Sequence, residues 1–410
     1  MSARLAISDR APEARVLDPE RALPAVQSLP VLRQFAIREL RPVGSWIKPG
    51  RYFNVVHRAY DESGYARGDV AVGLATPDLM RRIVRLQDRP CRQDEQCAHC
   101  SVVATEGGLF AHSYPLDLRL PKLRLAVRRS SLSRTLGPTL SVVQLTLKSW
   151  RPGMRCTLEA EFADGRRGFV KLTAQRDLAA LCERLRRAHH AVANDDRLEL
   201  PEVRACLPGA QLYVLGACRG RAIADMATDD ADDVAADVLS AFQSLAVDGI
   251  ERIHRTDDEL TLLKTWLDFL TRLQHRRLPV FARVFEALQM DAPRSERPPV
   301  VVHRDFYDKQ VLAYANGASL VDLDTFCRGD AELDAGNFLA HRTLRRVQGR
   351  GDGTRGHTNG RFVARLAGRV DPSTVRWYVR ATLLRLAAMY SVRPDGEDVW
   401  GPCLDEVQSV

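Results

Sequence analysis

Lysine is scarce in this 410-residue chain. Only six of its 60 basic residues are Lys, and the remainder are Arg. A Lys that persists among so many Arg residues is a weak indication that a compact ammonium group is needed at that position, although random drift explains most of the six equally well. The six are Lys48, Lys122, Lys148, Lys171, Lys264 and Lys309.

Long apolar runs are also missing. No segment approaches the roughly 20 apolar residues that a helix needs to cross a bilayer, and the N-terminal segment MSARLAISDRAPEAR mixes both charges without the apolar core of a secretory signal. The nine Cys residues are mostly scattered singly and form no regular disulfide framework. These absences argue against a membrane or secreted protein and predict a cytoplasmic one with reduced thiols.

The net charge of +8 is unevenly distributed along the chain. Residues 1–150 carry 23 Lys and Arg against 14 Asp and Glu, whereas residues 151–410 carry 37 against 38. A basic region can attract nucleic acid or another anionic partner. Because the Arg residues here are dispersed rather than clustered, a solvated surface is favoured, and nucleic acid is not expected as a partner.

Composition and local pattern predict an α+β protein with more than one lobe. Hydrophobic residues make up 45% and charged residues 27%, which is typical of globular domains, and the chain is too long for one ordinary core. Residues 141–171 read as three strands, residues 176–189 as a helix with apolar residues on one face, and residues 201–220 as two more strands. Beyond Gly220 most segments have helical periodicity.

The predicted organisation has three parts. Residues 1–130 form an accessory basic region, residues 131–220 a β-rich lobe, and residues 221–410 a helical lobe with a short β insert. The small, polar segment 130–140 is broken by Gly-Pro and is expected to be a linker or an irregular entry into the β-rich lobe.

The accessory region contains a hairpin that resembles one in the β-rich lobe. WIKPGRYFNVVHRAYDESG, from Trp46, and WRPGMRCTLEAEFADGRRG, from Trp150, share a Trp, a Pro-Gly pair suited to a type II turn, an alternating strand and an Asp-containing turn. Both a repeated module and a chance similarity of two Pro-Gly hairpins remain open. The first copy has no Lys where the second has Lys171, so no nucleotide site is expected there.

The clearest chemical pattern is a His-Arg-Asp triplet that ends at Asp305. Gln310 follows after four intervening residues, and Asp322 lies seventeen positions after Asp305, beyond a hairpin turn predicted at Asn316-Gly317. The protein-kinase catalytic loop has the similar pattern H-R-D-x-x-x-x-N, followed by a metal-binding Asp. In phosphoryl transfer a carboxylate orients the acceptor hydroxyl, and hard oxygen ligands hold Mg²⁺. The plainer interpretation is a pair of strands with polar ends.

At these residues the chain resembles the aminoglycoside phosphotransferase and choline kinase-like family. HRDFYDKQVL and LVDLDTFCRGDAELDAGNFLAH carry the resemblance, which extends over roughly residues 140–395. It implies a protein-kinase-like fold with a β-rich N-lobe and a helical C-lobe, preceded here by an additional N-terminal region. It also implies phosphorylation of a hydroxyl on a small molecule, dependent on Mg²⁺ and on ATP or another nucleoside triphosphate.

The resemblance implies roles for residues of the catalytic segment. Asp305 would be the catalytic base or orienting group, and Gln310 and Asp322 would bind Mg²⁺. Asp324 is an alternative to Asp322, because strand alternation would put both on one face. Gln310 stands where the family usually has Asn, and its longer side chain supplies the same amide oxygen. Arg304 stands where the family often has Gly.

The resemblance also implies nucleotide contacts in the β-rich lobe. Lys171 would pair with the phosphates. The turn at Pro152 and Gly153 would offer backbone N–H groups above them, and the hinge containing Val214 and Leu215 would contact adenine through its backbone. A Glu of the following helix should pair with the Lys, but Glu183 lies away from the apolar face of that helix, so this role stays unassigned.

Three further groups have structural and functional interpretations. His303 is expected to hold the catalytic loop by hydrogen bonds, and Asp330 and Asp334 to cap a helix start near residues 333–341. Zinc is a minority interpretation of Cys91, Cys97 and Cys100, since the usual two-pair spacing is absent. The acidic run from Asp229 to Asp237 suits a solvated helix start better than a site for a cationic substrate.

The sequence therefore favours a small-molecule kinase. The alternative is a kinase-like module that binds nucleotide or a partner without transferring phosphate. A protein substrate is disfavoured, because Asp322 leads quickly into the Asp330–Asp334 segment without a separate activation segment. The near-neutral charge of residues 151–410 does not favour a strongly cationic acceptor.

Overall fold

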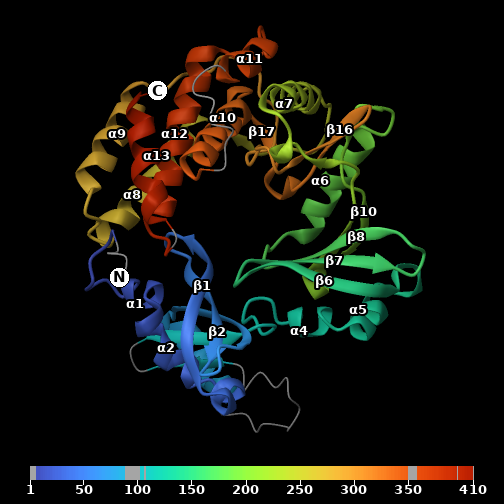
Figure 1. The fold of residues 1–410 in the computed structure, drawn as a ribbon. Helices are drawn as coiled ribbons and strands as arrows, with labels where there is room; N and C mark the ends of the chain where they lie inside the picture. Colours follow the sequence, from blue (N-terminus) through green and yellow to red (C-terminus); the bar gives the residue numbers. More distant parts are fainter. Residues whose placement is uncertain (1–5, 88–101, 106–107, 350–357, 395, 410) are drawn as a thin grey trace.

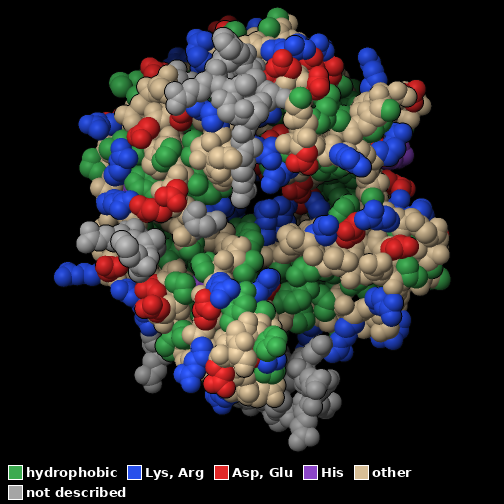
Figure 2. All heavy atoms as spheres, in the orientation of Figure 1, with side chains coloured by type: hydrophobic (Ala, Val, Ile, Leu, Met, Phe, Trp, Pro, Cys, Tyr) green, Lys and Arg blue, Asp and Glu red, His purple; other side chains and the backbone are tan. Residues whose placement is uncertain are grey.

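The computed structural model describes residues 6–87, 102–105, 108–349, 358–394 and 396–409. An N-terminal region, shown in blue in Figure 1, lies against both a β-rich N-lobe and a helical C-lobe. The face seen in Figure 2 is hollowed at its centre, where the three parts approach one another. Within the described ranges, no helix combines the length and the apolar character that crossing a bilayer requires.

The N-lobe is built on an antiparallel sheet with the strand order β10-β11-β8-β7-β6. Alternating residues of these strands are buried, because the sheet packs one face on the core. Helix α6 (Leu178–Ala191) follows the third strand and buries the apolar face predicted for it. The strands are β6 (Val142–Arg151), β7 (Arg155–Phe162), β8 (Arg167–Thr173), β10 (Val203–Leu207) and β11 (Leu212–Gly216).

The N-terminal region contains a second antiparallel sheet, with the order β1-β2-β3-β5-β4. When the strands of each sheet are numbered in chain order, they lie side by side in the order first, second, third, fifth, fourth in both sheets. The third strand is followed by a helix in both cases, α3 (Pro77–Gln87) here and α6 in the N-lobe. The strands are β1 (Ile37–Lys48), β2 (Tyr52–Asp61), β3 (Ala66–Leu74), β4 (Val102–Ala104) and β5 (Leu109–Ser113). The two similar hairpins therefore begin two sheets of the same connectivity.

Strand register shows how the two sheets differ chemically. In the N-lobe, Lys171 on β8 pairs with Tyr213 on β11. When the Trp-containing hairpins are matched strand for strand, Val72 on β3 and Ala111 on β5 occupy the corresponding places. The N-terminal sheet presents apolar side chains where the N-lobe presents an ammonium group and a phenol.

The segment 130–140 is not the linker that we expected. After α4 (Leu123–Ala126), helix α5 (Arg129–Leu136) occupies most of it. Leu132 is buried in the N-lobe core, and the Ser133 hydroxyl accepts a hydrogen bond from the Val142 N–H at 2.9 Å. The prediction was wrong because one buried Leu and one side-chain bond stabilise a helix that the polar composition does not suggest.

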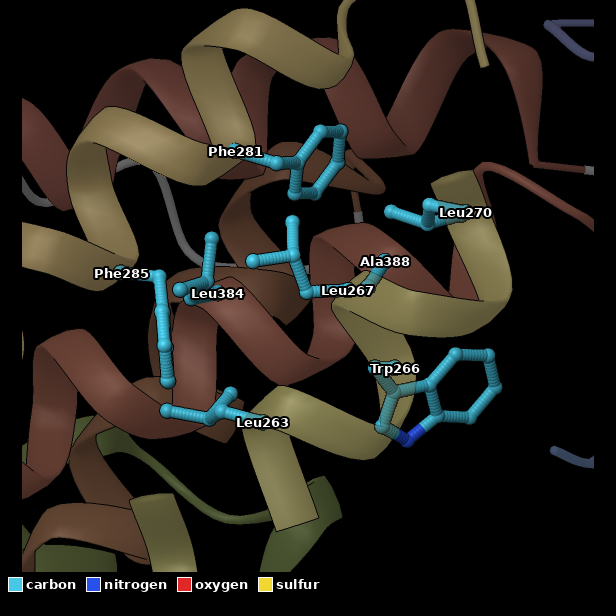
Figure 3. A pocket seen from close by; sticks show the side chains of 8 residues that line it. All are labelled: Leu263, Trp266, Leu267, Leu270, Phe281, Phe285, Leu384 and Ala388. Atoms are coloured by element: carbon cyan, nitrogen blue, oxygen red, sulfur yellow. The ribbon is translucent and has the colours of Figure 1, made fainter. Parts of the chain in front are cut away.

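The C-lobe is a helical assembly in which α12 is buried over most of its length. Figure 3 shows α8, α9 and α12 packed around an apolar cavity of about 10 Å³. This volume is at the lower limit for one water molecule, and apart from the Trp266 indole the lining side chains are apolar, so it is a packing defect of the core. The helices are α7 (Thr228–Gln243), α8 (Thr256–Arg272), α9 (Leu278–Met290), α10 (Glu332–Val347), α11 (Thr358–Arg365), α12 (Pro372–Tyr390) and α13 (Glu397–Ser409).

Two small sheets in the C-lobe position the predicted catalytic segment. One has the order β13-β17-β14 and the other β12-β15-β16-β9. The chain leaves the first sheet at β14 and enters the second at β15, so the segment between these strands is fixed at both ends. The strands are β9 (Leu198–Glu199), β12 (Arg221–Ala222), β13 (Ile253–His254), β14 (Val300–Val302), β15 (Val311–Tyr314), β16 (Gly317–Leu320) and β17 (Cys327–Gly329).

The N-terminal region shares a core with the C-lobe. Its helices α1 (Ala14–Leu17) and α2 (Pro19–Gln27) and one face of its sheet belong to the same apolar cluster as the C-lobe helices. The Ser8 N–H donates to the Leu273 carbonyl at 3.1 Å, and the rings of Phe53 and Phe269 lie 6.1 Å apart. The first described residues of the chain are thereby tied to the C-lobe.

Candidate active site

The catalytic segment begins with a backbone conformation that is unusual for Arg. Arg304 has φ +69°, in the left-handed region where a side chain costs roughly 1–2 kcal/mol. The buried Asp334 carboxylate of α10 accepts hydrogen bonds from the N–H groups of His303 at 2.6 Å and Arg304 at 2.8 Å. These charge-assisted bonds hold the turn. The positive φ of Arg304 is a conformation that Gly, which the resemblance often implies here, adopts without this cost.

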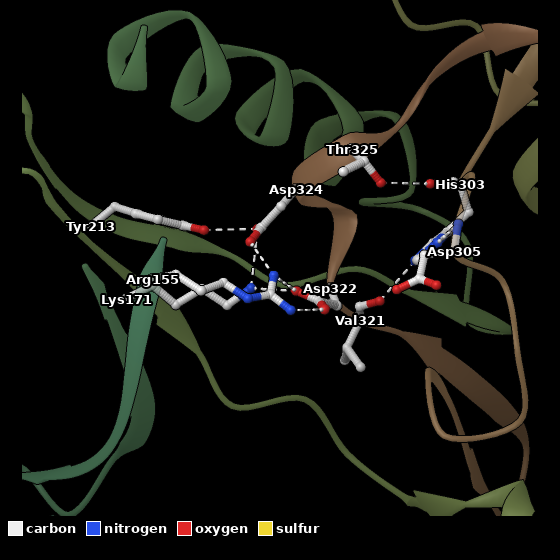
Figure 4. Close-up of polar contacts among 9 residues, drawn as sticks. All are labelled: Arg155, Lys171, Tyr213, His303, Asp305, Val321, Asp322, Asp324 and Thr325. Atoms are coloured by element: carbon white, nitrogen blue, oxygen red, sulfur yellow. Dashed lines mark hydrogen bonds and ion pairs between the residues drawn. The ribbon is translucent and has the colours of Figure 1, made fainter. Parts of the chain in front are cut away.

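Asp305 is positioned by the same turn. The His303 ring bridges Val321, whose carbonyl lies 2.9 Å from Nε2, and the Asp305 N–H, which lies 3.2 Å from Nδ1. The loop-holding role predicted for His303 is confirmed. Figure 4 shows Asp305 beyond Val321, on the side away from Lys171. The half-buried Asp305 carboxylate forms no hydrogen bond or ion pair with the residues that the structure describes.

A compact ion cluster joins the two lobes. Lys171 Nζ lies 2.8 Å from Asp322 and 3.0 Å from Asp324. Arg155 of β7 reaches the same two carboxylates, at 3.1 Å each. The Tyr213 hydroxyl donates to Asp324 at 2.7 Å. All five side chains are drawn in Figure 4. Two cations of the N-lobe therefore face two carboxylates of the C-lobe.

The charged groups of this cluster keep one another ionised. Burial favours neutral forms, but Lys171 and Arg155 outweigh it and hold the pKa of Asp322 well below its usual value. Burial likewise opposes the charge of Lys171, yet Asp324 and Asp322 raise its pKa above the usual value. Burial and the neighbouring Asp324 keep the pKa of Tyr213 well above its usual value, so the phenol remains a donor.

A pocket of about 470 Å³ adjoins the cluster, within the size range of small-molecule sites. Lys171, Arg155 and Asp322 line one part of it, together with Gln310. Another part is lined by Leu215 and the two residues after it, at the end of β11. Of the predicted hinge residues, Leu215 thus faces the pocket, whereas Val214 is fully buried in the sheet.

The predicted turn at Pro152 and Gly153 is present, but residues of the N-terminal region hold it. Gly153 has φ +74° and the Met154 N–H donates to the Arg151 carbonyl at 3.0 Å, as a type II turn requires. The Gly153 N–H donates to Asp117 of the N-terminal region at 2.8 Å. The Pro152 carbonyl accepts from the Asn54 amide at 3.1 Å. The N-terminal region therefore fixes the turn beside the pocket.

A protein-family model described as the phosphotransferase enzyme family matches residues 160–370, just over half of the chain. The chain belongs to this family. The match includes Lys171 and the whole catalytic segment, so the family resemblance noted in the sequence is confirmed. No protein of curated function matches the chain in sequence.

Solved structures resemble this chain in fold. A thermostable mutant of aminoglycoside phosphotransferase APH(4)-Ia, in ternary complex with ADP and hygromycin B, has a TM-score of 0.51 at 15% identity, covering 68% of this chain and 98% of that chain. The apo form of a thermostable mutant gives 0.52 at 16%, covering 69% and 99%. A choline/ethanolamine kinase family protein from Mesorhizobium loti gives 0.49 at 14%, covering 70% and 92%. The predicted α+β, kinase-like fold is confirmed.

Sequence reasoning missed Arg155 and Tyr213 at this candidate site. Arg155 is one of many Arg residues, and Tyr213 lies in an ordinary apolar strand, so neither stood out. Alternation along β7 and β11 supplies the only sequence signal, since Tyr213 pairs with Lys171 and Arg155 lies two residues before the other strand partner of Lys171. The acidic partners of Lys171 are Asp322 and Asp324, while Glu183 is exposed and pairs with Arg187.

The structure corrects how two acidic pairs reach their positions. Asp322 and Asp324 do not alternate along a strand: Asp322 has φ +62° and precedes a short 3-10 helix that contains Asp324. Asp330 and Asp334 do not cap α10, which starts at Glu332 without a side-chain cap. Asp330 instead accepts from the Tyr378 hydroxyl at 2.8 Å, and Asp334 holds the catalytic turn. Local pattern does not reveal such long-range partners.

Other sequence hypotheses have simpler outcomes. Cys91, Cys97 and Cys100 lie outside the described residues. The acidic run of α7 is largely neutralised, because Asp233 and Asp237 pair with Arg residues of α11 and Asp232 lies 3.3 Å from Arg342. A solvated, ion-paired helix start fits these contacts.

Proposed function

We propose that this protein transfers the γ-phosphoryl group of ATP, with Mg²⁺, to a hydroxyl group of a small molecule. The observation that carries the proposal is the ion cluster of Lys171, Arg155 and Asp322 on the wall of a nucleotide-sized pocket, next to an unpaired Asp305 on the same segment. Membership of the phosphotransferase family supports the reaction class.

The nucleotide assignment rests on the chemistry of the pocket. Lys171 and Arg155 offer the positive charge that phosphates need. Leu215 and its apolar neighbours suit a base, and we assign the predicted hinge contact to the end of β11 rather than to Val214. Pro152 and Gly153 act by holding the turn above the phosphates. The neighbouring APH(4)-Ia structure contains ADP and hygromycin B, which fits a nucleotide beside a small-molecule acceptor.

The residues present fit a magnesium ion. Asp322 is held ionised, and Gln310 lines the same pocket with a hard amide oxygen. Mg²⁺ typically takes only one or two protein carboxylates and fills its other positions with water and phosphate oxygens. Asp322 and Gln310 would hold it, with Asp324 beside them, and its charge would be shared by the phosphates.

The reaction then uses few groups of the protein. The acceptor hydroxyl oxygen attacks the γ-phosphorus, the bond from that phosphorus to the β,γ-bridging oxygen breaks, and ADP leaves with the bridging oxygen. Asp305 orients the hydroxyl and accepts its proton, which passes to solvent afterwards. Lys171 and Arg155 hold the nucleotide phosphates in place, so positioning and electrostatic stabilisation provide most of the rate.

One experiment separates this proposal from a catalytically inactive binding module. ADP and AMP-PNP binding are measured by calorimetry with and without Mg²⁺, and ATP consumption is measured over a panel of hydroxyl compounds. The proposal predicts Mg²⁺-dependent nucleotide binding together with acceptor-dependent ADP release. Nucleotide binding without transfer to any acceptor would favour the inactive module, and no nucleotide binding would contradict both.

A further inference from the structure

The turn between β1 and β2 lies at the junction of the two lobes. Immediately after this turn, the Phe53 ring packs 6.1 Å from Phe269 of the C-lobe, while the next residue, Asn54, donates to the Pro152 carbonyl of the N-lobe at 3.1 Å. Adjacent residues of one strand thus touch both lobes. These contacts hold the turn that precedes them, with Lys48 and Arg51, at the junction of the two lobes.

The C-lobe places two more cations at the same junction. Arg304 directly precedes Asp305, and Arg252 directly precedes β13. β17 lies between β13 and β14, with the Arg328 N–H donating to the Arg252 carbonyl at 3.0 Å and Cys327 paired with Val302. This small sheet therefore places Arg252 two strands away from the strand that leads into Arg304.

These cations repel one another. Partial burial and then the positive charges of Arg51, Arg304 and Arg252 lower the pKa of Lys48. Burial and then Arg252 lower the pKa of Arg304, while Cys327 and Glu259 oppose the shift and Arg385 adds to it. Burial is the larger cause for both residues, and the neighbouring cations act in the same direction.

Acidic partners for this group are scarce. Among the described residues, no Asp or Glu forms an ion pair with Lys48, Arg51, Arg252 or Arg304, and the buried Arg304 Nε lacks a hydrogen-bond partner. The nearby Glu259 carboxylate is engaged by His254 at 2.6 Å. Figure 2 shows Lys and Arg side chains gathered beside the central hollow. Among the described residues the Asp305 carboxylate is likewise without an ion pair.

We propose that the acceptor is an anionic hydroxyl compound whose phosphate or carboxylate group binds Lys48, Arg51, Arg252 and Arg304 while its hydroxyl faces Asp305. The inference rests on the proposed function and names its substrate class. An anion at this junction would relieve the mutual repulsion of the cations and gain charge-assisted hydrogen bonds from them. The α7 acids Asp232, Asp233 and Asp237 are paired with Arg residues, so they do not offer a cationic acceptor a free carboxylate.

The test measures binding to protein saturated with AMP-PNP and Mg²⁺, so that the nucleotide phosphates already occupy their site. Calorimetry compares glycerol 3-phosphate, glycerate and glucuronate with uncharged glycerol and cationic choline. We expect saturable binding of at least one anion, weakened by added salt, and no binding of glycerol or choline. Binding of choline or glycerol in preference to every anion, or no anion binding at all, overturns the inference.

Variants identify the residues. Arg252→Gln and Lys48→Gln should each weaken binding of the anion at least tenfold and leave AMP-PNP affinity unchanged. Arg252→Lys should keep part of the affinity for the anion. Arg38→Gln is the matched control, since this exposed residue lies at the opposite end of β1 from Lys48. Equal affinity in all variants would also overturn the inference. Failure of AMP-PNP to bind would instead contradict the proposed function, so the two failures are distinguishable.

Discussion

Arg155 joins the two lobes through ion pairs. Its guanidinium contacts both Asp322 and Asp324, and burial is outweighed by these carboxylates, which raise its pKa above the usual value. A fork of donors can hold two carboxylates and also face phosphates, whereas Lys171 acts as a point charge. The two cations are therefore not interchangeable.

Replacing Arg155 tests this difference. Arg155→Ala should raise the KM for ATP by about tenfold or more, because a charged contact with the phosphates is worth at least about 1.4 kcal/mol. The KM for ATP of Arg155→Lys should lie between those of Arg155→Ala and the native protein, because Lys keeps the charge but lacks the planar set of guanidinium donors. Initial-rate kinetics with varied ATP measure the effect.

Arg166→Ala is the control for that series. Arg166 lies in an exposed turn of the same sheet and pairs with Asp164, so its KM for ATP should match that of the native protein. An Arg155→Ala variant with unchanged KM for ATP would show that the guanidinium only joins the lobes.

Single residues were predictable from the sequence where spacing carries the information. The distance from Asp305 to Asp322 along the chain, with a hairpin between, anticipated that both would lie at one site. Arg155 was not predictable, because its role depends on two carboxylates more than 160 positions away. Glu183 gives a second example. The acidic partners of Lys171 are Asp322 and Asp324 rather than a Glu of the following helix, and only the folded chain reveals them.

At the scale of elements, the β6–β7 turn is controlled by the N-terminal region. The Asp117 carboxylate accepts from the N–H groups of Gly153 at 2.8 Å and Arg119 at 2.8 Å, and from the Trp150 indole at 3.1 Å. One buried carboxylate thus fixes the turn and the strand end that border the pocket. A bonded carboxylate of this kind is costly to remove, because its donors lose their partner.

Asp117→Ala should therefore lower stability by roughly 2–5 kcal/mol, because its backbone donors and the Trp150 indole lose a charged partner. Asp117→Asn should lower it less, and should still raise the KM for ATP more than it lowers kcat, since the turn is loosened. Thermal unfolding and ATP kinetics provide both readouts. Asp164→Asn, in an exposed turn at the other end of β7, should change neither; equal effects of the two Asn variants would refute a specific hold on the turn.

Most elements could be anticipated from hydrophobic periodicity, as β6, β7, β8 and α6 show. Helix α5 could not, because a single buried Leu132 stabilises a segment whose polar residues resemble a linker. The N-terminal strands were read only through one hairpin similarity. Their arrangement into a second sheet with the connectivity of the N-lobe depends on pairing between distant strands, which a local pattern does not encode.

For the whole molecule, buried charge makes stability depend on pH. Asp232 of α7 is 1% exposed, and burial raises its pKa to about 6, against 3.8 as its ordinary value, although Arg342 opposes the shift. Between these values the folded protein binds a proton that the unfolded chain has lost. Stability from this group is therefore greatest in acid and falls as the pH rises through about 6.

Asp232→Asn removes this dependence. The variant should be about as stable as the native protein at pH 4.5 and more stable by about 1 kcal/mol at pH 7.5, as measured by urea unfolding at both values. Asp268→Asn, an exposed substitution on α8, should change the free energy of unfolding by the same small amount at both pH values. A destabilised Asp232→Asn protein at pH 7.5 would show that the Arg342 ion pair outweighs burial.

The whole account depends on one transfer step beside Asp305. The most direct measurement is the rate at which phosphate from γ-labelled ATP appears on the acceptor, in the native protein and in Asp305→Asn, with Asp268→Asn as the control. Loss of a general base predicts a fall of roughly 10²–10⁴-fold in turnover, with nucleotide binding retained. Native-like transfer by Asp305→Asn would contradict the assignment of this site.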